Sequence, residues 1–205
     1  MAPKVIDKAK KRKDMALACS NLIHDVGIKN LTIQKVADSA GIGKGTVYEY
    51  FENKEDIIFE IINIHIENYQ NQFLKDITTF SSIKEKIFYF FNFVLNDDEE
   101  TSKHFNGYRE YLSIIFTDGN EGMWDFNEEC NIFIEEQLNQ IIQEGIDKNE
   151  LNPISKKFIK PIMIFEKGLV LVKMTQKNQN VKKECENFIN ELFALISTKE
   201  GIKNV

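Results

Sequence analysis

The sequence predicts an all-α protein, for two reasons. Three prolines and ten glycines are spread over 205 residues, so the chain has few of the turns that an all-β fold requires. Apolar residues recur three and four positions apart along much of the chain, which is the spacing of one helix face. With 42% hydrophobic and 28% charged residues, the composition is that of a globular protein long enough to bury a full core.

The charge is distributed unevenly. Residues 1–54 contain ten Lys and Arg against six Asp and Glu, whereas residues 55–205 contain sixteen against twenty-six. The net charge of −6 therefore conceals a basic N-terminal segment on an acidic body. This asymmetry indicates that the two parts of the chain have different functions. It is compatible with an anionic partner for the basic segment.

The sequence predicts a location in the cytoplasm. No apolar run approaches the roughly 18 residues of a membrane span, and the N-terminal residues lack the apolar core of a secretion signal. Cys19, Cys130 and Cys185 are odd in number and far apart. We therefore expect reduced thiols rather than a disulfide framework or a zinc site.

Cap residues and helical spacing set the predicted helices. Thr32 suits the N-cap of a short helix over residues 33–40, and Gly41 suits its end. Asn53, with Asp56 three residues later, suits the start of a long helix. The predicted helices cover approximately residues 15–26, ending at Gly27, and then 33–40, 44–51, 57–79, 83–95, 102–116, 123–145, 154–174 and 181–197.

Pro161 lies within the predicted helix over residues 154–174. Proline has no N–H and crowds the preceding turn of a helix. Two outcomes are therefore open, namely a kink in this helix or a later start.

Three glycines within five residues, in the stretch GIGKGTVYEYFENKED that begins at Gly41, suggest a phosphate-binding loop. The P-loop pattern is excluded, because Asp38 stands where its leading glycine belongs and Gly45 follows Lys44 where Ser or Thr is required. The dinucleotide-binding pattern is excluded as well, since a helix rather than a buried strand is predicted ahead of the glycines.

A helix-turn-helix explains the same stretch better. Ala37 is small enough for two helices to approach closely, and Gly41 can adopt the left-handed backbone of a tight turn. A small core is expected from Val36, Ile42, Val47 and Phe51. The outward residues would be Lys44, Gly45, Thr46, Tyr48, Glu49 and Tyr50. Hydroxyls and a lysine suit phosphates, and a glycine permits close approach to DNA.

Residues 31–58, LTIQKVADSAGIGKGTVYEYFENKEDII, resemble the DNA-binding segment of the TetR family of bacterial transcriptional regulators. The shared features are a Thr that opens the second helix, Ala-Gly at the turn, Lys-Gly-Thr and Tyr-x-Tyr-Phe in the third helix, and a Lys that starts the fourth. The resemblance covers about residues 12–62. It implies an N-terminal three-helix helix-turn-helix domain, residues 1–53, joined by a long helix to a larger helical domain for ligand binding and dimerisation, residues 54–205.

The resemblance assigns DNA contacts to seven residues. Phosphates would be bound by Thr32, Thr46, Tyr50 and Lys54, and the groove with its bases by Lys44, Gly45 and Tyr48. Partial burial as a cap on the small core is the alternative for Tyr48 and for Tyr50, and the Tyr50 hydroxyl could still donate in that position. Gly43 replaces the Ser or other small polar residue that is frequent in the family. For Glu49 two interpretations are open, namely acceptance of a hydrogen bond from cytosine N4 or a carboxylate that points to a lysine or to solvent.

The basic run from Lys8 to Lys13 also has two interpretations. It is either a solvated helix start or a second contact to the DNA backbone.

The resemblance further implies a homodimer and a small-molecule effector. Two apolar faces suit either an interface between subunits or the core of one subunit, and they consist of Ile164, Gly168, Leu171, Val172, Phe188, Ile189, Leu192, Phe193 and Ile196. Eight aromatic residues are candidates to line an effector pocket, with plain core packing as the alternative for each: Phe88, Phe91, Tyr108, Tyr111, Phe116, Trp124, Phe133 and Phe165. Such a pocket suits a hydrophobic or aromatic ligand.

The predicted function is that of a homodimeric repressor, which binds a roughly palindromic operator in double-stranded DNA and is released by a small hydrophobic or aromatic ligand. The alternative is a soluble helical ligand-binding or carrier protein with a vestigial DNA-binding head. No catalytic motif is recognised in the sequence, so an enzyme is not expected, and neither a metal nor a cofactor is predicted.

Overall fold

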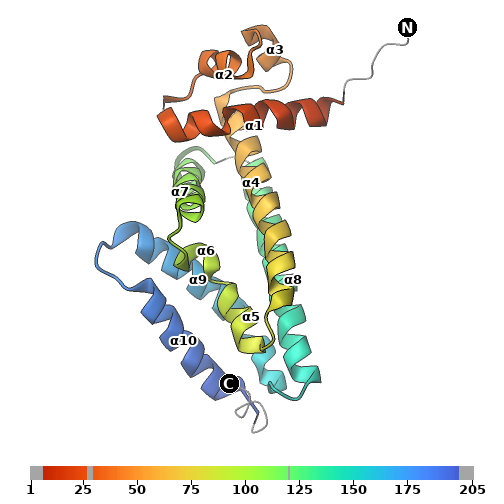
Figure 1. The fold of residues 1–205 in the computed structure, drawn as a ribbon, viewed down its shortest axis with the longest axis vertical. Coiled ribbons are helices and arrows are strands. Elements are labelled where there is room, and N and C mark those ends of the chain that lie inside the picture. Colours follow the sequence, from red (N-terminus) through yellow and green to blue (C-terminus); the bar gives the residue numbers. More distant parts are fainter. Residues whose placement is uncertain (1–6, 27–29, 120, 199–205) are drawn as a thin grey trace. The chain divides into compact units, whose positions relative to one another are not determined.

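In a computed structural model, residues 7–26, 30–119 and 121–198 are described, and most of them are helical (Figure 1). Within these ranges no extended strand forms, and Leu151 and Ser197 make an isolated β-bridge. The α-helices are α1 Lys8–Val26, α2 Ile33–Ala40, α3 Lys44–Tyr48, α4 Lys54–Asp76, α5 Ile83–Tyr89, α6 Asn92–Leu95, α7 Glu99–Asp118, α8 Glu121–Asp147, α9 Ile159–Thr175 and α10 Val181–Ile196, with the 3-10 helices η2 Ile77–Thr79 and η3 Pro153–Phe158. The all-α prediction is confirmed. None of the helices in the described ranges combines the length and the apolar character of a membrane span.

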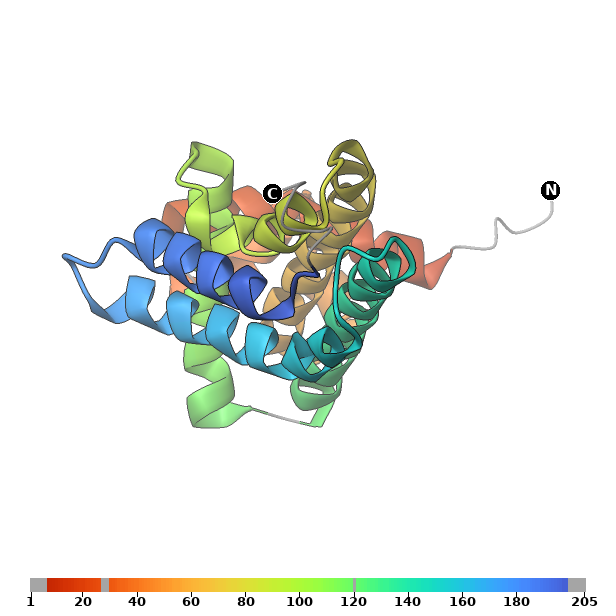
Figure 2. The same cartoon turned by 90° about the horizontal axis from the view of Figure 1, so that it is seen from below.

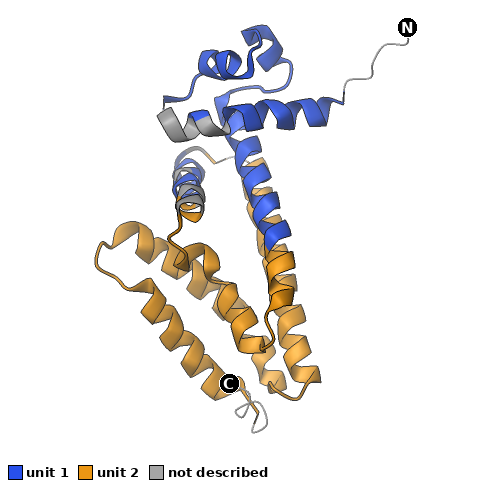
Figure 3. Ribbon diagram, viewed as in Figure 1, with its two compact units in different colours: residues 1–72, 106–117 blue, residues 73–105, 118–205 orange. Residues whose placement is uncertain are grey.

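The chain forms two compact units (Figure 3). Unit 1 comprises residues 1–72 and 106–117, and unit 2 comprises residues 73–105 and 118–205. Helix α4 therefore begins in unit 1, and its last residues belong to unit 2. The domain boundary predicted after residue 53 separates a DNA-binding domain from a domain for ligand binding and dimerisation, whereas the two units are defined by packing. The predicted boundary stays a prediction.

In unit 1, α2 packs against α1 through small and apolar residues. Ala16 and Cys19 of α1 and Val36 of α2 are buried. The Cys19 thiol donates a hydrogen bond to the Val36 carbonyl over 3.8 Å, and the Ser39 hydroxyl donates to the Ala18 carbonyl over 2.9 Å. The first two helices are thus joined both by packing and by hydrogen bonds. The predicted end of the first helix at Gly27 lies outside the described residues.

The core of unit 2 contains an aromatic cluster between α9, α10 and the segment that joins α5 to α6. Figures 1 and 2 show α9 and α10 side by side. Phe91 packs edge-on against Phe165 and Phe188, with ring centroids 5.9 and 6.4 Å apart, and Phe165 stacks on Phe188 at 3.9 Å. Phe91 is fully buried, so it forms the centre of this cluster.

The single helix predicted over residues 83–95 is wrong, because the structure divides it into α5 and α6. Phe90 and Phe91 lie at the break, where both are buried and their rings meet edge to face at 5.5 Å. The turn is tightened at this point, since the Phe91 N–H donates to the Phe88 carbonyl three residues back. This change of direction allows two consecutive rings to be buried together.

Pro161 occupies the first turn of α9, where a missing N–H leaves no helical hydrogen bond unmade. The residues ahead of it, 153–158, form η3 instead of α-helix. Of the two outcomes open from the sequence, the structure shows the later start. Asn152 anchors this junction, because its backbone N–H donates to the Ile196 carbonyl over 2.8 Å and its side-chain amide donates to the Ser197 carbonyl over 2.9 Å.

The three cysteines are free thiols. Cys19 and Cys185 are buried and Cys130 is half-buried. Burial raises the pKa of the Cys130 thiol to about 11 and that of Cys185 to about 12. These two thiols therefore stay protonated at neutral pH and pack as small apolar groups.

We predict that Gly145→Ala lowers the free energy of unfolding by about 1–3 kcal/mol in urea denaturation. A Cβ at position 145 in α8 would lie 2.8 Å from Cγ and Cδ1 of Leu151 and 3.2 Å from Ile83, and Leu151 is itself buried. Gly107→Ala in α7 is the control, because a Cβ there meets nothing within 4 Å. It should be neutral or stabilise by up to about 1 kcal/mol through helix propensity. Equal losses in both variants would contradict the steric explanation.

Candidate nucleic-acid interface

Cap residues shape α2 and the turn into α3. Thr32 Oγ1 accepts a hydrogen bond from the Lys35 N–H over 3.3 Å, which confirms its N-cap position. Gly41 has a φ of 65°, in the left-handed region that favours glycine, and the Ile42 N–H donates to the Ala37 carbonyl over 3.0 Å. The predicted helix-turn-helix is therefore present, with the turn set by the conformation of Gly41.

The α3 segment is short and has one buried side. Val47 is fully buried, and Phe51, one turn later, is 1% exposed. Helical hydrogen bonds continue past the end of α3, because the Glu49 N–H donates to the Gly45 carbonyl over 3.2 Å and the Phe51 N–H donates to the Val47 carbonyl over 3.0 Å. The side of the segment opposite Val47 therefore faces outward.

All seven residues predicted to contact DNA lie in one segment of unit 1, between the start of α2 and the start of α4. Thr32, Lys44, Gly45 and Tyr48 are exposed, and Thr46, Tyr50 and Lys54 are half-buried. The large ring of Tyr48 is 58% exposed, so it is available to a partner. A Cβ at Gly43 or Gly45 would meet nothing within 4 Å, so the packing of unit 1 does not require glycine at either position.

The start of α4 presents a lysine close to this segment in the sequence. Asn53 Oδ1 accepts a hydrogen bond from the Asp56 N–H over 2.8 Å, as predicted for the cap. Lys54 is the first residue of the helix, and its Nζ lies 3.8 Å from a carboxylate oxygen of Glu55. An exposed ion pair contributes little, so the Lys54 ammonium can exchange this carboxylate for a phosphate at small cost.

Arg12 ties α1 to the segment that carries the predicted contacts. Its Nε donates to Glu60 over 2.7 Å, its Nη2 donates to Asp56, and its Nη1 donates to the Tyr50 carbonyl over 2.5 Å. Its guanidinium carbon lies 4.5 Å from the centre of the Phe51 ring. Burial acts to lower the pKa of Arg12, but the hydrogen bonds and charges of Asp56 and Glu60 outweigh it and raise the pKa. This cation therefore stays charged and joins α1, α4 and the end of the α3 segment.

The role of Arg12 does not follow from the basic run, which predicts a solvated helix start or a contact to DNA. The lysines of the run are exposed, and Lys13 pairs at the surface with Glu67 at 2.7 Å. Two signals in the sequence indicate this partly buried network. Arg12 is an arginine among lysines, and Asp56 and Glu60 are four residues apart, so they share one face of α4.

Five of the eight predicted pocket residues belong to unit 2, namely Phe88, Phe91, Trp124, Phe133 and Phe165. Phe91 and Phe165 meet in the aromatic cluster, together with Phe188, which the sequence does not single out for the pocket. Phe133 packs edge-on against a different ring, that of Phe73, at 6.5 Å. The structure therefore brings together part of the predicted set and adds Phe188 to it.

The remaining members of the set are dispersed. In unit 1, Tyr108 stacks on Tyr111 with ring centroids 6.3 Å apart, and Tyr111 is fully buried. Phe116 is 79% exposed and Trp124 is 54% exposed, so both lie at the surface of their units. The predicted pocket stays a prediction for these residues.

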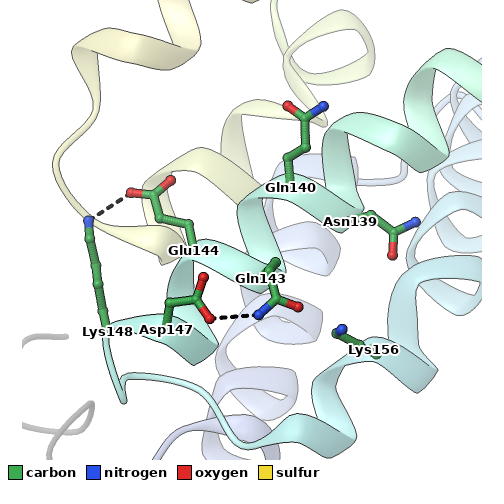
Figure 4. Close-up of a pocket in the computed structure, with 7 residues that line it drawn as sticks. All are labelled: Asn139, Gln140, Gln143, Glu144, Asp147, Lys148 and Lys156. Atoms are coloured by element: carbon green, nitrogen blue, oxygen red, sulfur yellow. Dashed lines mark hydrogen bonds and ion pairs between the residues drawn. The ribbon is translucent and has the colours of Figure 1, made fainter.

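Unit 2 carries an open cleft of about 690 Å³, shown in Figure 4. It is lined by residues that carry amide or charged groups, namely Asn139, Gln140, Gln143, Glu144, Asp147, Lys148 and Lys156. Several of these groups already satisfy one another, since Lys148 pairs with Glu144 at 2.7 Å and Gln143 donates to Asp147 over 2.7 Å. None of the eight predicted aromatic residues lines this cleft.

Glu166 is a carboxylate on the inward face of α9. Ile162, Met163 and Leu169, three and four residues away, are buried on the same face. Within the described residues, Glu166 forms no ion pair. Burial raises the pKa of Glu166 to about 7, although the charge of Lys167 opposes this change. The carboxyl group therefore titrates near neutral pH.

We predict that Arg12→Ala lowers the free energy of unfolding of unit 1 by about 2 kcal/mol, because two carboxylates and a carbonyl lose their shared donor. Hydrogen exchange of the α1 and α4 amides would measure the loss within this unit. Lys13→Ala is the matched control, because its ion pair with Glu67 is exposed and should contribute less than about 1 kcal/mol. Losses of the same size in the two variants would contradict the role given to Arg12.

We predict that Glu166→Gln stabilises the protein at pH 8 but not at pH 4.5. In the unfolded chain the carboxyl ionises near 4.5, and in the folded chain near 7, so the wild-type protein loses stability as the pH rises through this window. The penalty above pH 7 is at most about 3 kcal/mol, and glutamine removes it. Urea denaturation at both pH values measures the difference. Glu136→Gln, at an exposed position of α8, should show the same change at both pH values.

Residues 18–61 match the sequence profile of the family described as bacterial regulatory proteins, tetR family. The match contains all of α2 and α3 together with the turn between them. It therefore covers the helix-turn-helix and the start of α4.

Two relatives match this chain over a longer stretch. The fatty acid metabolism regulator protein of Bacillus subtilis (strain 168) is 32% identical over 82 residues, which are 39% of this chain and 42% of that protein. The HTH-type transcriptional repressor KstR2 of Mycolicibacterium smegmatis is 30% identical over 88 residues, which are 42% of this chain and 43% of that protein. The chain thus matches less than half the length of each of these relatives.

The whole fold has counterparts among solved structures. A transcriptional regulator of the TetR family from Cytophaga hutchinsonii superimposes with a TM-score of 0.76 at 17% identity, over 96% of this chain and 99% of that one. The two findings agree: residues 18–61 match the helix-turn-helix profile of the TetR family of bacterial regulatory proteins, and the chain has the fold of the TetR-family regulator from Cytophaga hutchinsonii.

Proposed function

We propose that the protein is a homodimeric transcriptional repressor, which binds a palindromic operator and is released from it by a small ligand. The observation that carries the proposal is the outward side of α3, where Lys44, Gly45 and Tyr48 are exposed while Val47 is buried. The major groove admits one α-helix, and a helix with a glycine at its outer side can approach the bases closely.

The residues around α3 supply donors for the DNA backbone. Thr32, Thr46 and Tyr50 carry hydroxyl groups, and Lys54 carries an ammonium at the first position of a long helix. Phosphate contacts of this kind fix the register of a protein on DNA, whereas contacts to base edges give its specificity. The exposed lysines of α1 add positive charge to the same unit, which favours DNA at low salt.

A second copy of this chain is the partner that we propose for α9 and α10. Ile164 and Leu171 of α9 and Leu195 of α10 are 69%, 59% and 69% exposed, and the corresponding helices of a second subunit would cover them. Other residues of the predicted apolar faces are buried within unit 2 and belong to its core: Ile189, Leu192, Phe193 and Ile196. Two subunits would place two copies of α3 in successive major grooves, which is why the operator should be palindromic.

The effector that we propose has an apolar body. The aromatic cluster around Phe91 and the separate contact of Phe133 place several aromatic rings in the interior of unit 2, and one relative is named a regulator of fatty acid metabolism. The ligand would favour a state in which the two copies of α3 are wrongly spaced for the operator. Helix α4 contributes residues to both units, so a displacement of its last turn can be transmitted to its first.

Binding to duplexes from the region upstream of the protein's own gene tests the proposal, with fluorescence anisotropy as the measurement. We expect selective binding that weakens steeply with salt. Tyr48→Ala should reduce the preference for the operator over random DNA by about tenfold or more, because a base contact is lost in each half-site. Lys54→Gln should weaken binding to every duplex and lower the salt slope by about 1 per subunit.

Lys75→Gln, at an exposed position near the end of α4, is the control. It should change neither the preference for the operator nor the salt dependence of binding. Binding without sequence preference at every salt concentration would argue against a regulator and for a carrier protein with a vestigial head. A long-chain fatty acid is the first effector to test. An apolar ligand that saturates the protein but leaves operator affinity unchanged would contradict release by ligand.

A further inference from the structure

Glu49 occupies the outermost side-chain position of the α3 segment. Successive helical residues are about 100° apart, so Glu49 lies about 200° from Val47, and Gly45 lies about 160° from it. Both positions therefore face away from the buried side, one turn apart. The helical path extends to Glu49, whose φ and ψ are −71° and −20° and whose N–H bonds to the Gly45 carbonyl. Because Gly45 has no side chain, the Glu49 carboxylate is the group that this outward face, opposite Val47, presents to a partner.

This carboxylate is not neutralised within the described part of unit 1. Glu49 is exposed, and no ion pair joins it to a basic side chain of the described residues. Arg12 is held by Asp56 and Glu60, and Lys54 lies near Glu55. Of the two interpretations that the sequence leaves open, pairing with a lysine is therefore not observed.

A carboxylate without a basic partner, on a helix that enters the major groove, discriminates strongly between the four bases. Duplex DNA carries one negative charge per roughly 1.7 Å, so a carboxylate near the phosphates weakens binding unless it meets a donor. In the major groove the donors are the amino groups of cytosine N4 and adenine N6, whereas guanine and thymine present acceptors. Adenine also presents the N7 acceptor beside its amino group, which repels a carboxylate. Cytosine is thus the base that fits.

We propose that Glu49 is a specificity-determining residue, which accepts a hydrogen bond from cytosine N4 and excludes guanine and thymine at one position of each half-site. The inference rests on the proposed function, because it requires α3 to enter the major groove. Tyr48 and Lys44, one turn apart on one side of the same segment, would contact the adjoining base pairs. By the dimer symmetry, the operator would contain this cytosine twice, once on each strand.

Selection from random duplexes, followed by sequencing of the bound fraction, tests the inference with wild-type protein, E49Q and E49A. Wild-type protein should select cytosine at one position in each half-site. E49Q should change this preference to adenine, because the glutamine amide can donate to N7 and accept from N6. E49A should lose selectivity at that position alone. Operators in which guanine replaces this cytosine should bind wild-type protein about tenfold more weakly or worse.

E52Q is the matched control, because it removes the same charge from an exposed residue of the turn that follows α3. It should raise affinity for all duplexes slightly and leave the selected sequence unchanged. Thermal unfolding of each variant shows that the fold is retained, which is expected because both side chains are exposed.

The failures of the two proposals are distinguishable. If wild-type protein selects a palindrome and E49Q selects the same palindrome with the same bases, the role of Glu49 is overturned and the proposed function stands. If E52Q shifts the base preference as E49Q does, the effect is one of net charge and the role of Glu49 is again overturned. If wild-type protein selects no sequence at all, both the proposed function and this inference are overturned.

Discussion

The guanidinium of Arg12 joins the end of the α3 segment to α1 and α4. Helix α3 has five residues, far fewer than the roughly 12 that an isolated helix needs to be even marginally stable in water. Its conformation therefore comes from its surroundings, namely the burial of Val47 and Phe51 and the hydrogen bond that Arg12 donates to the Tyr50 carbonyl. The same guanidinium binds Asp56 and Glu60, so α1 and α4 together hold the outward face of α3 in place.

Local features were predictable from the sequence because their causes are local. Thr32 caps α2 and Gly41 supplies the left-handed turn, and each conclusion needs only a few neighbouring residues. The cap that Asn53 provides for α4 is of the same kind. The seven predicted DNA contacts lie together for the same reason, since they are close in the sequence and the turn between α2 and α3 fixes their arrangement.

Features that depend on distant residues were not predictable in this way. The two carboxylate partners of Arg12 are more than 40 residues away, and the basic run around it suggests a solvated surface. The break between α5 and α6 lies where Phe91 is buried against Phe165 and Phe188, on helices that come much later in the chain. Aromatic composition alone likewise cannot separate Phe91 and Phe165, which meet in the core, from Phe116, which is largely exposed.

The position of Trp124 determines what an optical experiment on this protein can detect. It is the chain's single tryptophan, it lies near the start of α8 in unit 2, and more than half of its surface is exposed. Its emission therefore reports the polarity around one solvated indole of unit 2. Unfolding of unit 1 alone would leave this signal largely unchanged, so a tryptophan fluorescence melting curve describes unit 2. Unit 1 needs a reporter of its own, such as the ring resonances of Tyr48 and Tyr50.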